Sequence, residues 1–166
     1  IPNEAVSITV GENVKMRVRL VDCVGYLVNN AIGYLEDDMP RMVKTPWSEE
    51  EIPFETAAEL GTKKVIVEHS TVGIIVTTDG TITDIPREAY TAAEERVVNE
   101  LKELNKPFIM LMNCQNPNDT YSIQMANDLS AKYGATVIPI NCLELNLDDI
   151  NLVFSKLLYE FMIERV

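Results

Sequence analysis

The chain has 166 residues, 46% of them hydrophobic and 24% charged, with a formal net charge of −12 from 26 acidic and 14 basic side chains. This length and composition favour one compact domain over two domains or intrinsic disorder. The acidic surplus argues against a nucleic-acid partner, because binding a phosphate backbone needs lysine and arginine gathered on one face. No apolar run approaches the roughly 18 residues of a membrane span, and residues 1–20 lack the order of a signal peptide.

Cysteine and histidine offer little chemistry in this sequence. The three cysteines form no CxxC pair and leave an odd count, which is typical of a reducing compartment rather than of a disulfide framework. The single histidine, His69, has no clustered ligands around it in the sequence. This disfavours both a zinc site and a catalytic triad built on a histidine base.

The amino-terminal third begins with a predicted hairpin. Two strand-like runs, residues 5–10 and 14–22, flank a short turn at Gly11. The second run alternates at first and is then continuously apolar up to Asp22, which predicts a strand that passes from a sheet edge into its interior. Residues 23–53 show no sustained periodicity, and we expect a long switch-type loop there, since such connections in compact domains are usually functional or mobile.

Helices and strands alternate along the rest of the chain. The spacing of apolar residues predicts helices over 54–65, 89–104, 125–133 and 150–161, and strands over 72–77, 108–112 and 136–140. This alternation implies right-handed crossovers and a mainly parallel sheet with helices on both faces. The predicted fold class is therefore α/β, with a single domain over 1–166.

Polar residues follow the predicted strands, and ligands bind at that edge of an open α/β sheet. Asp22 and Gly25 form a DxxG motif directly after an apolar run. In nucleotide hydrolases this motif places a carboxylate near Mg²⁺ and a glycine amide near the terminal phosphate. A strand-end aspartate with a turn glycine is the simpler alternative, because DxxG is common by chance.

A second candidate motif follows the predicted strand 108–112. Asn113 begins the sequence NCQN at the place where GTPases carry their base-reading NKxD, and Asn116 stands where the acid would be. An amide offers one acceptor and one donor, which disfavours guanine and suits the edge of adenine. Asn141, after the following strand, would lie beside the base in such a fold. Each of these asparagines also fits a turn or capping role.

The P-loop of nucleotide hydrolases is missing from this sequence. None of the seven glycines is followed by lysine, so GxxxxGK[ST] cannot be placed. The chain therefore has no lysine for the β- and γ-phosphates and no hydroxyl for Mg²⁺, and we expect it not to hydrolyse a nucleotide alone. Two interpretations stay open: an ATPase domain whose hydrolysis changes the switch region, and a nucleotide-independent scaffold with a degenerate GTPase-like fold.

Several longer segments carry a specific resemblance across nearly the whole chain. They are residues 19–26 (RLVDCVGY), 40–42 (PRM), 45–47 (TPW), 68–73 (EHSTVG), 77–82 (TTDGTI), 93–97 (AEERV) and 106–110 (KPFIM). Together they resemble the ATPase domain of the stage IV sporulation protein A family, the spore-coat morphogenetic proteins of endospore-forming bacteria. The resemblance implies a three-layer P-loop NTPase fold of the translation-factor GTPase type, with one antiparallel edge strand, that uses ATP and Mg²⁺.

The same resemblance implies roles for individual residues. Asp22 resembles the Walker B aspartate, which holds Mg²⁺ through water, and Gly25 the switch glycine. From their places after the strands, Asn113, Asn116 and Asn141 are expected near the base. Arg41 or Lys44 is expected near the phosphates, as in the switch regions of other NTPases; solvated charges on the loop are the alternative. The family's Walker A loop precedes the region that aligns with this chain. In GTPase-like sheets the strand before that loop lies beside the strand that begins near Val72, so we expect a gap there; Val21 paired beside Ile75 would contradict this.

The resemblance also implies a setting for the full-length protein. In that family ATP hydrolysis drives polymerisation into the basal layer of the spore coat, in the mother-cell cytoplasm at the outer surface of the forespore. The implied partners are further copies of the protein, a small amphipathic peptide that marks the forespore membrane, and other coat morphogenetic proteins. The charge of −12 predicts that the isolated domain repels its own copies at low salt.

Overall fold

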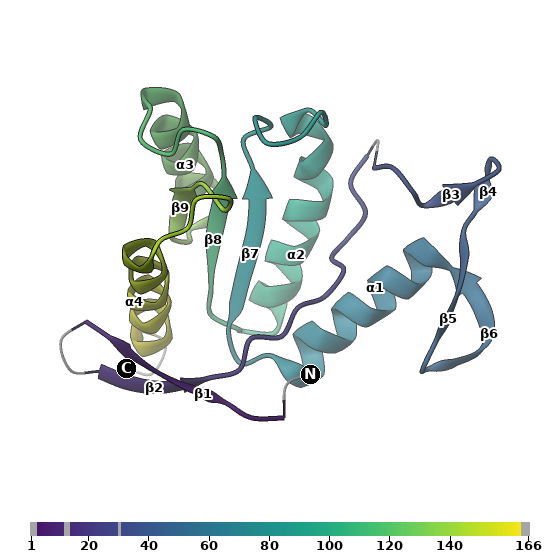
Figure 1. Cartoon of the computed structure of the whole chain (residues 1–166), viewed down its shortest axis with the longest axis horizontal. Helices are drawn as coiled ribbons and strands as arrows, with labels where there is room; N and C mark the ends of the chain where they lie inside the picture. The colour runs from purple at the N-terminus through teal and green to yellow at the C-terminus, as the bar shows by residue number, and fades with distance from the viewer. Residues whose placement is uncertain (1–2, 12–13, 30, 164–166) are drawn as a thin grey trace.

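The central feature of the fold is a three-stranded parallel sheet (Figure 1). The computed structural model describes residues 3–11, 14–29 and 31–163, with only the backbone for 161–163. The strand order is β7 (Gly73–Thr78), β8 (Phe108–Asn113), β9 (Val137–Ile140), and all three strands run in the same direction. This is the sheet that the alternating helix and strand patterns predict.

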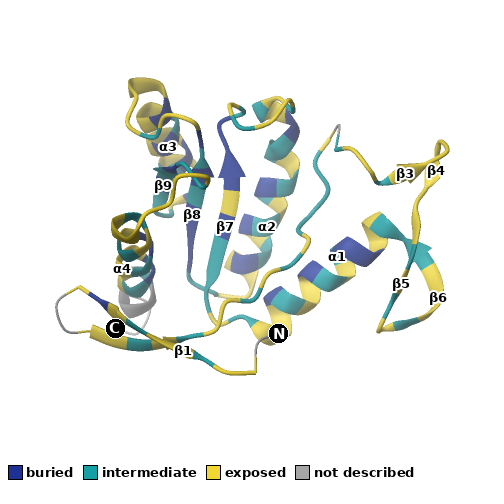
Figure 2. Cartoon of the chain, viewed as in Figure 1, coloured by how far each residue is buried: buried dark blue, intermediate teal, exposed yellow. Residues whose placement is uncertain are grey.

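Helices cover both faces of this sheet, which gives three layers. On one face, α2 (Thr91–Glu103) and α3 (Thr120–Tyr133) pack over Met110 and Met112, which are fully buried in β8. On the other face, α4 (Leu147–Ile163) packs over Ile109. Successive side chains of a strand point to opposite faces, so β8 needs an unbroken apolar run to contact both helical layers. Figure 2 shows β8 as the most buried strand of the sheet.

The amino-terminal part of the chain forms separate two-stranded ribbons and one helix. The strands β1 (Val6–Val10) and β2 (Val14–Val18) pair with each other, as predicted. The remaining strands form two further hairpins: β3 (Leu35–Glu36) with β4 (Met39–Pro40), and β5 (Met42–Thr45) with β6 (Ser48–Pro53). They precede α1 (Phe54–Lys64), which continues into a π-helical turn over Val65–His69.

Three expectations about this part of the chain need correction. The predicted strand 14–22 ends at Val18, because all of its pairing is with β1 and residues 19–22 continue without a strand partner. Among the described residues the main sheet is purely parallel, so the expected antiparallel edge strand is wrong: antiparallel pairing occurs only in the separate ribbons. Residues 23–53, which were expected to form one long switch-type loop, contain four short strands.

The hairpin β3–β4 shows why its strands escaped prediction. Its turn is formed by Asp37 and Asp38, both with positive φ (50° and 62°), in place of the Asn-Gly or Asp-Gly pair that signals such turns. Strands of two residues are also too short to show a period of two.

Among the helices of the described residues, none combines the length and apolar character that a membrane span requires.

Candidate functional site

A cavity lies between the DxxG segment and the outer edge of β7. Its volume is about 410 Å³, and its walls are residues 21–26 and Val28, the end of α1 with its π-helical turn, residues 72–77 and one side of α2. Within the described part of the chain, no strand pairs with this side of β7. Val21 is in no strand and does not pair with Ile75. Pairing of these two residues would have contradicted the gap expected beside β7.

The DxxG segment is fixed to the helices on both sides of this cavity. The Gly25 amide donates a hydrogen bond of 3.0 Å to Thr62 Oγ1 in α1. The Tyr26 hydroxyl donates to the carboxylate of Glu100 in α2, and the Arg96 guanidinium lies 3.9 Å from the centre of the Tyr26 ring. Burial and the hydrogen bond to Glu100 raise the pKa of Tyr26 well above its usual value, so the phenol stays protonated.

Asp22 lines the cavity with an exposed carboxylate. In the described residues no three His, Cys, Asp or Glu side chains gather into a cluster that could hold a metal on their own. Mg²⁺ is usually held in nucleotide sites by one or two carboxylates together with phosphate oxygens and water. A single accessible carboxylate at the cavity wall therefore fits Mg²⁺ bound largely by a nucleotide.

The three asparagines lie apart from Asp22, at the carboxyl edge of the sheet. Asn113 Oδ1 accepts a hydrogen bond of 2.9 Å from the Cys142 amide, which ties the ends of β8 and β9 together. Asn141 donates to the Gln115 carbonyl (3.2 Å) and accepts from the Leu143 amide (3.0 Å). Asn116 is exposed, and its carbonyl accepts from the Asp119 amide in the turn before α3. None of the three lines the cavity beside Asp22.

Arg41 lies in a third place. It is exposed between β4 and β5, where its guanidinium is 5.9 Å from the centre of the Phe54 ring. Figure 1 shows these hairpins beyond the amino-terminal end of α1, away from β7, β8 and β9. The structure thus brings Asp22 and Gly25 together, brings the three asparagines together, and places Arg41 with neither group. The role of each residue toward a nucleotide stays a prediction.

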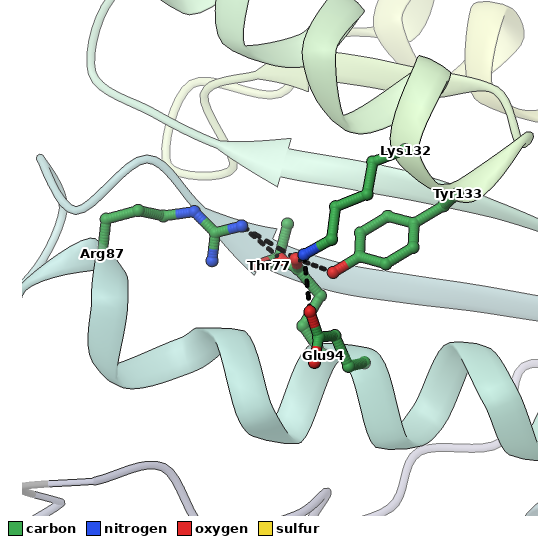
Figure 3. A network of polar contacts seen from close by, with 6 residues as sticks. Thr77, Arg87, Glu94, Lys132 and Tyr133 are labelled. Atoms are coloured by element: carbon green, nitrogen blue, oxygen red, sulfur yellow. Dashed lines mark hydrogen bonds and ion pairs between the residues drawn. The ribbon is translucent and has the colours of Figure 1, made fainter.

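A buried polar network supports the carboxyl edge of β7 (Figure 3). Its centre is Glu94 of α2, only 4% exposed, which accepts hydrogen bonds from Thr77 (2.5 Å), from Arg87 at both carboxylate oxygens (2.8 Å each) and from Tyr133 (2.7 Å). Burial and the bond to Glu94 raise the pKa of Tyr133 to about 12. The network joins β7, α2, α3 and the 3₁₀ turn at Arg87, so it fixes the loop that follows β7.

Sequence reasoning missed Thr62, Tyr26 and Glu94. Glu94 carries a usable signal: it stands four residues before Val98 and seven before Leu101, on the buried face of α2. A carboxylate in that position needs buried partners. Thr62 and Tyr26 carry no comparable signal, because their partners are 37 and 74 residues away in the sequence.

The sheet, its two helical layers and the DxxG loop define an α/β domain of a kind compatible with P-loop NTPases. Residues 1–162 match the family model of the stage IV sporulation protein A ATPase domain. The chain is 51% identical to stage IV sporulation protein A of Bacillus anthracis, 49% to that of Bacillus subtilis (strain 168) and 44% to that of Clostridioides difficile (strain 630). No solved structure matches it.

These alignments cover all 166 residues of the chain but 34% of each relative. The chain belongs to the stage IV sporulation protein A family, and its residues correspond to the ATPase domain of those sporulation proteins. It spans about a third of the length of the curated relatives, so the activity of the whole protein is a matter of proposal.

Proposed function

We propose that this chain is the part of an ATP-hydrolysing domain that carries its Walker B aspartate and switch loop. The observation that carries the proposal is the position of the Asp22–Gly25 segment: it lies across a cavity from the unpaired edge of β7. In nucleotide hydrolases the phosphates are held between such a loop and the P-loop, which follows a strand of the same sheet.

The unpaired edge of β7 suits a further strand. Backbone amides and carbonyls along that edge lack strand partners within the described residues, and such groups are stabilised when another strand pairs with them. The cavity walls on either side are α2, mostly through Ala93, Val97 and Leu101, and the DxxG segment. We propose that a segment outside this chain adds a strand parallel to β7 and leads into the phosphate-binding loop.

The residues present suit the Mg²⁺ nucleotide in part. Asp22 would hold Mg²⁺, through water, and Mg²⁺ would neutralise charge on the phosphates. Gly25 would donate its amide to the terminal phosphate. Asn116, which is exposed at the sheet edge, is the asparagine most accessible to an adenine base, because Asn113 and Asn141 already bond to the chain itself.

We also propose a biological role for the full-length protein. ATP hydrolysis would license polymerisation of the protein into the basal layer of the spore coat, in the mother-cell cytoplasm at the forespore surface. Its partners would be other copies, a small amphipathic membrane-marking peptide and other coat morphogenetic proteins. Family membership supports this role.

The test is phosphate release from ATP and from GTP by the full-length protein, with Asp22→Ala beside it. Asp128→Ala serves as the matched control, since Asp128 is an exposed residue of α3 whose carboxylate accepts a hydrogen bond from Gln124 on the same helix. We expect ATP to be preferred, Asp22→Ala to lose turnover by at least about 100-fold, and the control to match the wild type. If the folded wild-type protein releases no phosphate from either nucleotide, the scaffold interpretation is favoured.

A further inference from the structure

The Gly25–Thr62 hydrogen bond joins the DxxG loop to a fully buried hydroxyl. Thr62 lies in the last turns of α1 and is 1% exposed. Its Oγ1 accepts from the Gly25 amide over a separation of 37 residues. Gly25 is partly buried, and this bond supplies its amide with an acceptor, so it contributes to the position of the loop.

The geometry of Gly25 allows the amide to turn without moving its neighbours far. Its φ is +82°, in the region that favours glycine, and a Cβ at this position would meet no heavy atom within 4 Å. The next residue, Tyr26, is held by Glu100 and Arg96 of α2. The Gly25 N–H lies in the Val24–Gly25 peptide plane, so a coupled change of Val24 ψ and Gly25 φ, which glycine tolerates, can redirect it while Tyr26 stays in place.

The Gly25 amide has one hydrogen, and in this structure it is directed at Thr62. An oxygen of a terminal phosphate can accept the same hydrogen only if the bond to Thr62 breaks. We propose that Thr62 is a positioning residue that holds the Gly25 amide away from the nucleotide, and that release of this bond is a step in engaging the terminal phosphate. This inference rests on the proposed function of Gly25.

Loss of the Thr62 hydroxyl should raise the affinity for ATP, whereas loss of a merely structural contact would lower it. A hydrogen bond that exists in only one of two states opposes the other state by its own net contribution. Thr62→Val keeps the shape and the helix propensity of threonine but removes the acceptor. The variant should therefore bind ATP more tightly, by about 2- to 10-fold, which is the size of one net hydrogen bond. If Thr62 merely supported the site, the variant would bind more weakly.

The experiment compares full-length wild type, Thr62→Val, Thr62→Ser and Thr56→Val for affinity toward the non-hydrolysable ATP analogue AMP-PNP and toward ADP. Thr56 is an exposed threonine of the same helix and serves as the control. The gain in affinity of Thr62→Val should appear with the triphosphate analogue AMP-PNP and not with ADP, which lacks the terminal phosphate. Thr62→Ser, which keeps the hydroxyl, should match the wild type, as should Thr56→Val.

Hydrogen exchange of residues 22–28 without nucleotide provides the second readout. Exchange should be faster in Thr62→Val than in the wild type and unchanged in Thr56→Val. Unchanged or weaker analogue binding by a folded Thr62→Val protein would overturn the proposal. If that variant does not fold, Thr62→Ala carries the same expectation. Wild-type protein that binds no nucleotide would refute the proposed function as well, whereas wild-type binding with no gain in the variant would refute the role of Thr62 alone.

Discussion

The two parts of the chain reach their structures in different ways. From β7 onward, each strand is followed by a helix that packs onto the sheet. These units supply most of the buried core, to which the π-helical turn adds Ile66. Before β7, strands pair only with their immediate neighbours in the sequence. Among the described residues, the buried ones of this earlier part are few, and they are Val10, Ala57, Ala58, Thr62 and Ile66.

This difference shows which part of the chain specifies its own position. The units from β7 to α4 bury β8 on both faces, whereas β7 still borders the cavity. The DxxG segment instead lies over a cavity and is held by a few polar contacts to α1 and α2. The DxxG segment therefore belongs to the part of the chain with fewer buried residues. It lies beside the edge of β7 where we propose that another strand pairs.

The largest expected effect comes from removing the charge at the centre of the buried network. Glu94→Ala would leave the Arg87 guanidinium, whose side chain is 14% exposed, without its ion-pair partner. Removing one member of a buried pair typically costs about 3–5 kcal/mol. Glu95→Ala is the matched control, since its pairing with Lys132 is exposed and should contribute within about 1 kcal/mol.

Urea unfolding followed by circular dichroism measures both changes. Equal losses of unfolding free energy in the Glu94 and Glu95 variants would contradict the central place of this network.

A pair of methionine truncations compares the two parts directly. Met110→Ala empties a fully buried position in β8 and should cost about 2–5 kcal/mol of unfolding free energy. Met39→Ala, in β4, removes a side chain that is 69% exposed and should change the unfolding free energy by less than about 0.5 kcal/mol. The same urea titration measures both. A large loss at Met39 would show that the hairpins contribute to the core.

Tyr133 predicts a pH dependence in the part of the chain after β7. Tyr133→Phe removes a hydrogen bond to the Glu94 carboxylate and should cost about 1.5–3 kcal/mol near neutral pH. The pKa of Tyr133 is raised from 10.0 to about 12 in the folded chain, so its contribution is complete below pH 10 and is lost as the pH rises toward 12.

The gap in stability between wild type and Tyr133→Phe should therefore narrow from pH 10 upward. Chemical unfolding at pH 8, 10 and 11 checks this. A gap that widens with pH would contradict the raised pKa.

The smallest effect is expected at the loop itself. Tyr26→Phe removes the hydrogen bond to Glu100 but keeps the ring beneath Arg96, and should cost about 0.5–1.5 kcal/mol. Its clearer consequence is local: the amides of residues 22–28 should exchange faster, while those of β8 keep their wild-type rates. Faster exchange throughout the sheet would show that the loop and the sheet unfold together.

The helices and the parallel strands were predictable from periodicity. Gly134 is one example: it directly follows the predicted helix 125–133, where a glycine typically ends a helix, and it ends α3 with φ of +62°. The stretch of β8 that is apolar on both faces predicted a buried parallel strand in the same way. These features depend on residues close together in the sequence, and they can therefore be predicted from a single sequence.

The pairing of β2 and the surroundings of the loop were not predictable in this way. The apolar run up to Asp22 indicated a longer strand, but a strand forms only where a partner is available, and β2 has β1 alone. The contacts of Gly25 with Thr62 and of Tyr26 with Glu100 depend on how distant elements pack. Periodicity cannot report such contacts, because it describes one element at a time.

The most direct test of this account is an experimental structure of a longer form of the protein, extended upstream of Ile1. We expect a strand hydrogen-bonded parallel to β7, between β7 and the Asp22–Gly25 segment, that leads into a phosphate-binding loop facing Asp22. An edge of β7 that stays unpaired in the longer protein, or residues 19–22 paired directly with β7, would contradict it.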